Sequence, residues 1–214
     1  MKLVLFDCDG TLIDSQNAIA SAMDEAFAHV GRASPGRAKT LSIVGLSLPE
    51  AIAALAPSEG TDMQVRLAEG YRAAAQRIRS AHAEDPLFPG ADAAVRSLAK
   101  RDNTVLGTAT GKSLRGVQRM IAHNGWDGLF ATLQTADDNP SKPDPGMILR
   151  AVRETGATAD NTVMIGDTTF DMLMARAAGV RAVAVSWGYH PVADLREAGA
   201  HDVVETFEQL VALL

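Results

Sequence analysis

The chain has 214 residues, of which 47% are hydrophobic and 21% charged, and its net charge is −6. This composition is typical of a folded globular protein and excludes a strongly basic protein that binds nucleic acid or an anionic membrane. No apolar run approaches the roughly 18 residues of a membrane span. The one cysteine, Cys8, allows no disulfide within the chain. Without a secretory signal, this predicts a cytoplasmic protein that binds neither nucleic acid nor membrane.

The first predicted element is a buried strand from Lys2 to Phe6, an apolar run that ends at Asp7 and Asp9. Alternation along a strand would point both carboxylates to one face, unless the turn has already begun. Two carboxylates held close repel each other and call for a proton or a cation, most simply a hard divalent cation. The alternative interpretation is a strand closed by an ordinary polar turn, because Asp-Gly is a common turn signal.

A helical region follows the strand. From Ser15, a plausible N-cap, apolar residues recur at three- and four-residue spacing until Gly31, a plausible stop. A loop with glycine and proline comes next. Further helices are predicted over 48–55 and from Thr61, which would cap a helix whose apolar face ends near Ile78. Residues 15–82 are therefore expected to be all-helical, and 82–90 to form a linker.

The remainder alternates between helix and strand, which predicts an α/β fold with a doubly wound, Rossmann-like parallel sheet. The first strand must join this sheet, so the helical region is an insertion. We therefore expect an α/β core of residues 1–14 and 83–214 and an inserted helical cap of residues 15–82. The predicted helices are 91–101, 113–123, 145–155 and 169–178, the predicted strands are 104–109, 130–135, 162–166 and 181–186, and a weaker helix–strand–helix tail follows.

Polar residues stand at the ends of three of these strands or in the loops that follow. They are Thr110 to Lys112, Ser141 to Pro145, and Gly166 to Asp171. Each has an ordinary explanation, since Thr110 would serve as a helix N-cap, Lys142 as a solvated loop residue, and the acids as a helix first turn. In a parallel sheet, however, all these ends meet at the edge where ligands bind. The ordered set is therefore more informative than its parts.

This ordered set resembles the haloacid dehalogenase-like hydrolases, and most closely the branch with a helical cap that contains phosphoglycolate phosphatase. The resemblance covers the whole chain, including the Trp187-Gly188-Tyr189 and Ala198-Gly199-Ala200 segments of the tail. One departure is Gly111, which stands where close relatives often have asparagine. The four family motifs match Asp7 to Thr11, Thr110, Lys142 to Pro145, and Gly166 to Asp171.

The resemblance implies a Mg²⁺-dependent phosphatase. Asp7 would be the nucleophile that forms an aspartyl phosphate, and Asp9 the general acid and base, with its backbone carbonyl on the metal. Phosphoryl oxygens would be held by Thr110, Lys142 and backbone groups near Gly10 and Gly111. The metal ligands would be Asp7, Asp9 and Asp167, supported by Asp171 through water or Lys142.

The cap is expected to choose the substrate, a small phosphorylated metabolite such as phosphoglycolate or a sugar phosphate. The turn at Gly45 to Ser47 resembles the substrate-facing loop of relatives. Arg37, Lys39 and Ser47 are therefore predicted to contact the substrate, whereas the arginines at 72, 77 and 79 are interpreted as a solvated helix face. The chain is expected to act as a monomer or a homodimer.

Other functions remain open at this stage. A phosphosugar mutase would use the same aspartyl phosphate and pass the phosphoryl group to a sugar hydroxyl. A dehalogenase would not need Asp9 or a metal. A receiver-like signalling domain combines similar residues, but it is about half as long and has no helical insertion. A binding protein without activity would not require all four motifs.

Overall fold

The computed structural model describes residues 1–81 and 84–214. Within them, six strands form one parallel sheet in the order β3-β2-β1-β4-β5-β6. This is the doubly wound α/β fold predicted from the alternation of helices and strands. The strands are β1 (Lys2–Phe6), β2 (Thr104–Thr110), β3 (Phe130–Thr135), β4 (Thr162–Gly166), β5 (Arg181–Val185) and β6 (Asp202–Val204).

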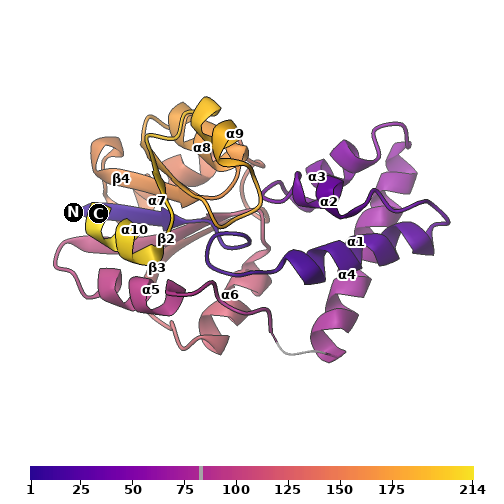
Figure 1. Ribbon diagram of the computed structural model, residues 1–214, viewed down its shortest axis with the longest axis horizontal. Coiled ribbons are helices and arrows are strands. Elements are labelled where there is room, and N and C mark those ends of the chain that lie inside the picture. Colours follow the sequence, from indigo (N-terminus) through magenta and orange to yellow (C-terminus); the bar gives the residue numbers. More distant parts are fainter. Residues whose placement is uncertain (82–83) are drawn as a thin grey trace.

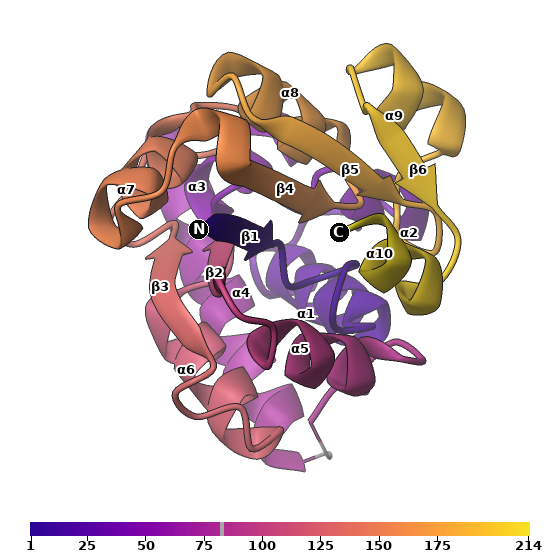
Figure 2. The same ribbon diagram turned by 90° about the vertical axis from the view of Figure 1, so that its left-hand side faces the viewer.

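Helices cover both faces of this sheet (Figure 2). Successive residues of β1 point to opposite sides: Val4 and Phe6 pack into one apolar core, and Leu3 and Leu5 into the other. The central strand is therefore buried on both faces. The first core includes residues of α5 (Ala91–Ala99), α6 (Leu114–His123) and α10 (Phe207–Leu213), and the second includes residues of α7 (Gly146–Thr155), α8 (Thr169–Ala177) and α9 (Val192–Glu197).

The remaining helices form a separate lobe beyond one edge of the sheet (Figure 1). Its core includes Met23, Phe27, Ile52 and Leu67, which do not belong to either core of the sheet. The lobe therefore has its own apolar packing. It consists of α1 (Gln16–His29), α2 (Arg37–Leu41), α3 (Leu48–Leu55) and α4 (Thr61–Ala81), while the short helix η1 (Ala159–Asn161) belongs to the sheet domain.

The helices of the lobe follow the predicted pattern with two local differences. The short helix α2 was not predicted, because five residues show no period. Ser15 precedes α1, but its side chain makes no capping hydrogen bond. Its N–H donates to the Tyr189 hydroxyl at 3.1 Å instead. None of the helices in the described part of the chain has the length and apolar character needed to cross a bilayer.

Candidate active site

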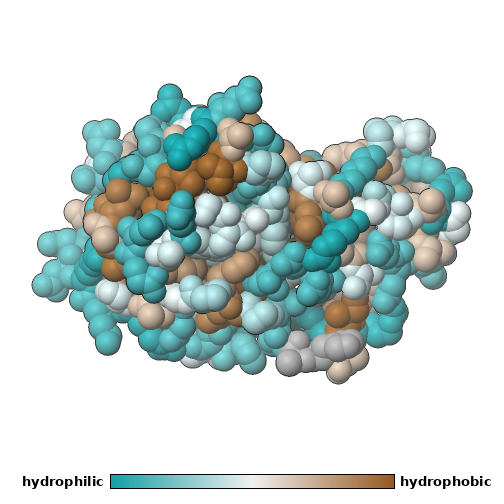
Figure 3. All heavy atoms as spheres, in the orientation of Figure 1, coloured by the Kyte–Doolittle hydropathy of each residue, from teal (hydrophilic) through white to brown (hydrophobic). Residues whose placement is uncertain are grey.

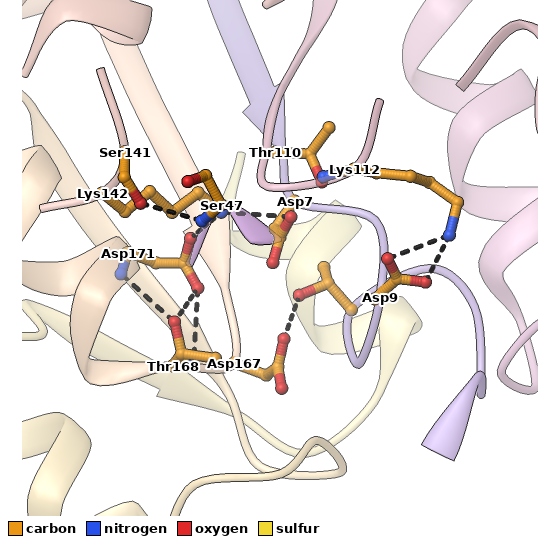
Figure 4. A network of polar contacts seen from close by, with 11 residues as sticks. Asp7, Asp9, Ser47, Thr110, Lys112, Ser141, Lys142, Asp167, Thr168 and Asp171 are labelled. Carbon is orange, nitrogen blue, oxygen red and sulfur yellow. Dashed lines mark hydrogen bonds and ion pairs between the residues drawn. The ribbon is translucent and has the colours of Figure 1, made fainter. Parts of the chain in front are cut away.

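Three neighbouring strands bring polar residues to one edge of the sheet (Figure 4). Asp7 follows β1 directly, Thr110 is the last residue of β2, and Asp167 follows β4. Lys142 comes from the loop between β3 and α7, and Asp171 lies in the first turn of α8. Because β2, β1 and β4 are adjacent and parallel, their carboxyl ends converge, as the sequence predicted.

Three of the carboxylates form a buried acidic cluster. Asp7, Asp167 and Asp171 each offer an oxygen, and these atoms all lie within 4.8 Å of one another. The ammonium of Lys142 lies 3.1 Å from Asp7 Oδ1 and 2.6 Å from Asp171 Oδ1. One cation thus faces three carboxylates. When all four groups are ionised, two negative charges remain uncompensated in a site away from water.

The three carboxylates are held differently. Asp171 accepts hydrogen bonds from Lys142 on one oxygen and from the N–H and hydroxyl of Thr168 on the other. Asp167 accepts one from the Thr11 hydroxyl and one from the Tyr189 N–H. Neither oxygen of Asp7 receives a hydrogen bond within the described residues, although both are buried. Asp7 is therefore the carboxylate most available to a metal ion or a substrate.

Burial changes the pKa values of these groups. It raises the pKa of Asp7 from 3.8 to about 6, because Lys142 offsets the loss of hydration only in part. The pKa of Asp167 is raised well above its usual range by burial and by the charges of Asp7 and Asp171. Burial alone would lower the pKa of Lys142, but Asp171 and Asp7 outweigh it and raise that pKa. The lysine therefore stays charged, while the carboxylates favour a proton or a cation.

Two glycines allow the chain to close around Asp167. A Cβ at Gly10 or at Gly188 would overlap the Asp167 side chain. Gly10 also has a φ of +86°, which disfavours any residue with a side chain. The N–H of Gly10 donates to the Ile13 carbonyl at 2.9 Å. This N–H is therefore occupied within the turn, and the contact between a phosphoryl oxygen and the backbone near Gly10 stays a prediction.

Asp9 does not join the acidic cluster. Strand β1 ends at Phe6, so the alternation expected for Asp7 and Asp9 is lost in the turn. The Asp9 carboxylate instead pairs with Lys112, with 2.6 Å and 2.9 Å between Nζ and its two oxygens. Lys112 was not among the residues predicted for the site. Its place two residues after Thr110, at the end of β2, was the only signal available.

A cavity of about 1060 Å³ lies between the lobe and the sheet. It reaches the edge of the sheet where Asp7 and Thr110 lie, which we call the reactive edge. Asp7, Asp9 and Thr110 line it from the sheet side, and Ser47 lines it from the lobe. The N–H of Ser47 donates to the Ser141 hydroxyl at 2.8 Å. The lobe loop therefore contacts the segment that carries Lys142.

Of the three other residues predicted to contact the substrate, only Gly111 lines the cavity within the described residues. Arg37 and Lys39 are exposed on α2 and are not among the cavity-lining residues that the structure describes. Arg37 instead donates a hydrogen bond to Gln16. Gly111 does line the cavity, but it lies against the carbonyls of Gly45 and Leu46, with which any Cβ would collide. An asparagine at this position would displace the lobe loop.

Comparisons with known proteins agree with this site. The profile of the haloacid dehalogenase-like hydrolase family matches residues 4–185. The chain belongs to the haloacid dehalogenase-like hydrolases.

Two curated relatives are phosphatases by name. "Probable phosphatase IndB" of Dickeya dadantii is 33% identical over 98% of this chain and 91% of its own length. A phosphoglycolate phosphatase of Pseudomonas syringae pv. syringae is 28% identical over 98% of this chain and 78% of its own. The crystal structure of a hydrolase from Pseudomonas syringae superposes with a TM-score of 0.87 at 26% identity, covering 100% of this chain and 97% of that one.

Proposed function

We propose that this phosphatase depends on Mg²⁺ and hydrolyses a small phosphorylated metabolite through an aspartyl phosphate on Asp7. The observation that carries the proposal is the state of Asp7, which is buried at a strand end, faces the cavity, and has an ion pair with Lys142 but no hydrogen bond on either oxygen within the described residues. A carboxylate in this setting is poised to attack an electrophile. Because two of its relatives are phosphatases by name, phosphorus is the electrophile that we expect Asp7 to attack.

The residues present fit a magnesium ion. The acidic cluster supplies only oxygen ligands, which hard divalent cations prefer, and its two excess negative charges equal the charge of one such ion. Asp7, Asp167 and the backbone carbonyl of Asp9 would hold it, with Asp171 behind them through water or Lys142. When bound, Mg²⁺ would neutralise this charge and reduce the repulsion between Asp7 and a dianionic phosphate.

The reaction would proceed in two steps on residues of this chain. An oxygen of Asp7 attacks phosphorus, the ester P–O bond breaks, and the leaving oxygen takes a proton from Asp9. Asp9 then accepts a proton from water, whose oxygen attacks the aspartyl phosphate and releases inorganic phosphate. Lys142 and Thr110 would stabilise the charge on the phosphoryl oxygens in both steps.

We further propose that residues 15–82 act as a cap that excludes water and chooses the leaving group, while the core supplies the chemistry. The four motif groups all lie outside this segment, and its own apolar core supports an independent unit. Gly10 and residues 86–90 are the expected hinges. The predicted boundary between 82 and 83 lies outside the described residues.

The test is a phosphate-release screen over phosphorylated metabolites, including phosphoglycolate and sugar phosphates, with Mg²⁺. Phosphate release that is lost in Asp7→Asn and needs no bisphosphate activator supports the proposal. A requirement for such an activator, with an isomeric sugar phosphate as product, would indicate the phosphosugar mutase instead. Absence of turnover on every ester would contradict both enzymes and favour a phospho-acceptor or binding role.

A further inference from the structure

Four arginines line the same cavity as Asp7, and all of them lie outside the motifs and the acidic cluster: Arg72, Arg79, Arg115 and Arg119. The last three form a group. Arg79 lies on α4 of the lobe, and Arg115 and Arg119 lie on α6 of the sheet domain. In Figure 1, α4 descends from the lobe toward the side of the molecule where α6 lies. We call these three residues the arginine cluster. The seam is the boundary between the lobe and the sheet domain. Because Arg79 comes from one side of it and Arg115 and Arg119 from the other, only the tertiary fold brings Arg79 near the other two.

The three guanidinium groups are close enough to affect one another. The pKa of Arg79 is lowered by partial burial and by the positive charges of Arg119 and Arg115. Such mutual repulsion is unfavourable unless an anion offsets it. Hydrophilic side chains also cover much of the seam between the lobe and the sheet domain on the face shown in Figure 3. This part of the cavity wall is polar and places three guanidinium groups beside the carboxylates of Glu84 and Asp85.

Only one of the three arginines has an ion-pair partner within the described residues. Arg119 Nε lies 3.5 Å from Glu84 Oε1, yet this buried nitrogen makes no hydrogen bond. Arg79 and Arg115 form no ion pair in the described part of the chain. Asp85 also lines the cavity, but its neighbours include Lys112 and Asp9. The cluster thus retains an excess of positive charge and an unused donor.

The cluster is connected to the reactive edge but stands away from it. Tyr71 lines the same cavity, and its pKa is raised to about 12 by burial and by the charge of Asp9, while Lys112 and Arg79 act in the opposite direction. On α4, Arg79 is eight residues beyond Tyr71, a rise of about 12 Å. On α6, Arg119 is five residues beyond Leu114, a rise of about 8 Å.

We propose that the substrate is a phosphate monoester whose leaving alcohol carries a second anionic group, which binds between Arg79, Arg115 and Arg119. This inference rests on the proposed phosphatase activity. The second group is a carboxylate or a phosphate, because both match the fork of a guanidinium. Its charge would relieve the repulsion within the cluster and hold the lobe and the sheet domain on one ligand.

The experiment compares matched esters. Glucose 6-phosphate and 6-phosphogluconate differ by a carboxylate at the far end, and fructose 6-phosphate and fructose 1,6-bisphosphate differ by a second phosphate. In the wild type, kcat/KM is expected to be at least about 10-fold higher for one of the two anion-bearing members than for its partner. Preference for 6-phosphogluconate identifies the carboxylate, and preference for the bisphosphate identifies the phosphate.

The variants Arg79→Gln and Arg119→Gln test the site itself. Each should reduce this preference by about 10- to 100-fold, the effect of one lost charge-assisted contact. Arg77→Gln is the matched control, because Arg77 is an exposed residue of the same helix that pairs with Glu25 and does not line the cavity. It should leave both the preference and the hydrolysis of p-nitrophenyl phosphate unchanged. Arg119→Lys should recover part of the preference.

Two failures are distinguishable. If the wild type hydrolyses p-nitrophenyl phosphate but prefers neither anion-bearing ester, or if Arg79→Gln and Arg119→Gln keep the full preference, the arginine site is refuted and the phosphatase proposal stands. If no ester is hydrolysed, the phosphatase proposal fails and the substrate inference fails with it. Calorimetric titration of Asp7→Asn with the preferred anion-bearing ester and its matched partner should show tighter binding of the anion-bearing ester, without turnover.

Discussion

Asp7→Asn should remove activity and, in metal-free protein, increase stability. Asp7 is buried, and its pKa in the folded state is raised from 3.8 to about 6. At 1.36 kcal/mol per pKa unit, keeping this carboxylate ionised at pH 7.5 costs the fold ~3 kcal/mol. Asparagine has nearly the same shape and no charge. Lys142 keeps its contact with Asp171, so the substitution leaves no unpaired ammonium.

The pH dependence follows from the sign of this shift. The folded state binds a proton on Asp7 more tightly than the unfolded state does. The resulting stability is fully present below pH ~3.8 and is lost as the pH rises through about 6. The wild type should therefore lose stability over this interval relative to Asp7→Asn. The charge of Asp7 also raises the pKa of Asp167, so the difference between the two proteins includes the relief of this repulsion.

The assay is urea unfolding in EDTA at pH 4 and pH 7.5, followed by phosphate release with Mg²⁺. Asp7→Asn should exceed the wild type by up to about 3 kcal/mol at pH 7.5, match it near pH 4, and lose several orders of magnitude in kcat. Asp127→Asn, at an exposed position, should change neither quantity. A metal-free Asp7→Asn that is less stable than the wild type at pH 7.5 would refute the electrostatic argument, and retained turnover would refute the nucleophile.

Three further outcomes are expected. Chelation should abolish phosphate release, and added Mg²⁺ should restore it. Ca²⁺ should inhibit, because it accepts a looser ligand shell than Mg²⁺ does. Activity that survives chelation would contradict the metal assignment. Gly10→Ala should lower the unfolding free energy more than Gly128→Ala, since both positions have positive φ but only the first Cβ would overlap Asp167; equal losses would show that backbone strain alone matters. Lys112→Met should reduce kcat by about 10-fold by releasing Asp9 from its observed position, with Lys112→Arg largely restoring it; an unchanged kcat would remove Lys112 from the mechanism.

The sequence predicted the reactive edge well for a physical reason. Strand ends are fixed by local patterns, and parallel strands bring those ends to one edge whatever the details of packing. Asp7, Thr110 and Asp167 could therefore be placed together before any coordinates were known. Asp9 was harder to place, because alternation holds only within a strand and β1 ends at Phe6.

The cap contacts could not be placed in the same way. Arg37 and Lys39 were selected because they precede the Gly45 turn in the sequence. The structure folds this stretch into the short helix α2, with both side chains exposed. Arg79 was interpreted as part of a solvated face, since its helix shows a polar stripe there. Its position in the cavity depends on how α4 packs relative to α6. The pattern of residues along α4 alone does not predict that packing.

The two charged regions of the cavity explain how a chain of net charge −6 could attract a phosphorylated substrate. Beyond about 10 Å at 0.1 M salt, exposed charges are largely screened, so the groups inside the cavity dominate at close approach. A metal ion and Lys142 would bind the phosphoryl group, which the buried carboxylates alone would repel. The arginine cluster would serve the other end, where the described wall carries more positive than negative charge. An ester with charge at both ends matches this division, whereas an ester with a neutral leaving group leaves only Glu84 to offset the repulsion between Arg79, Arg115 and Arg119.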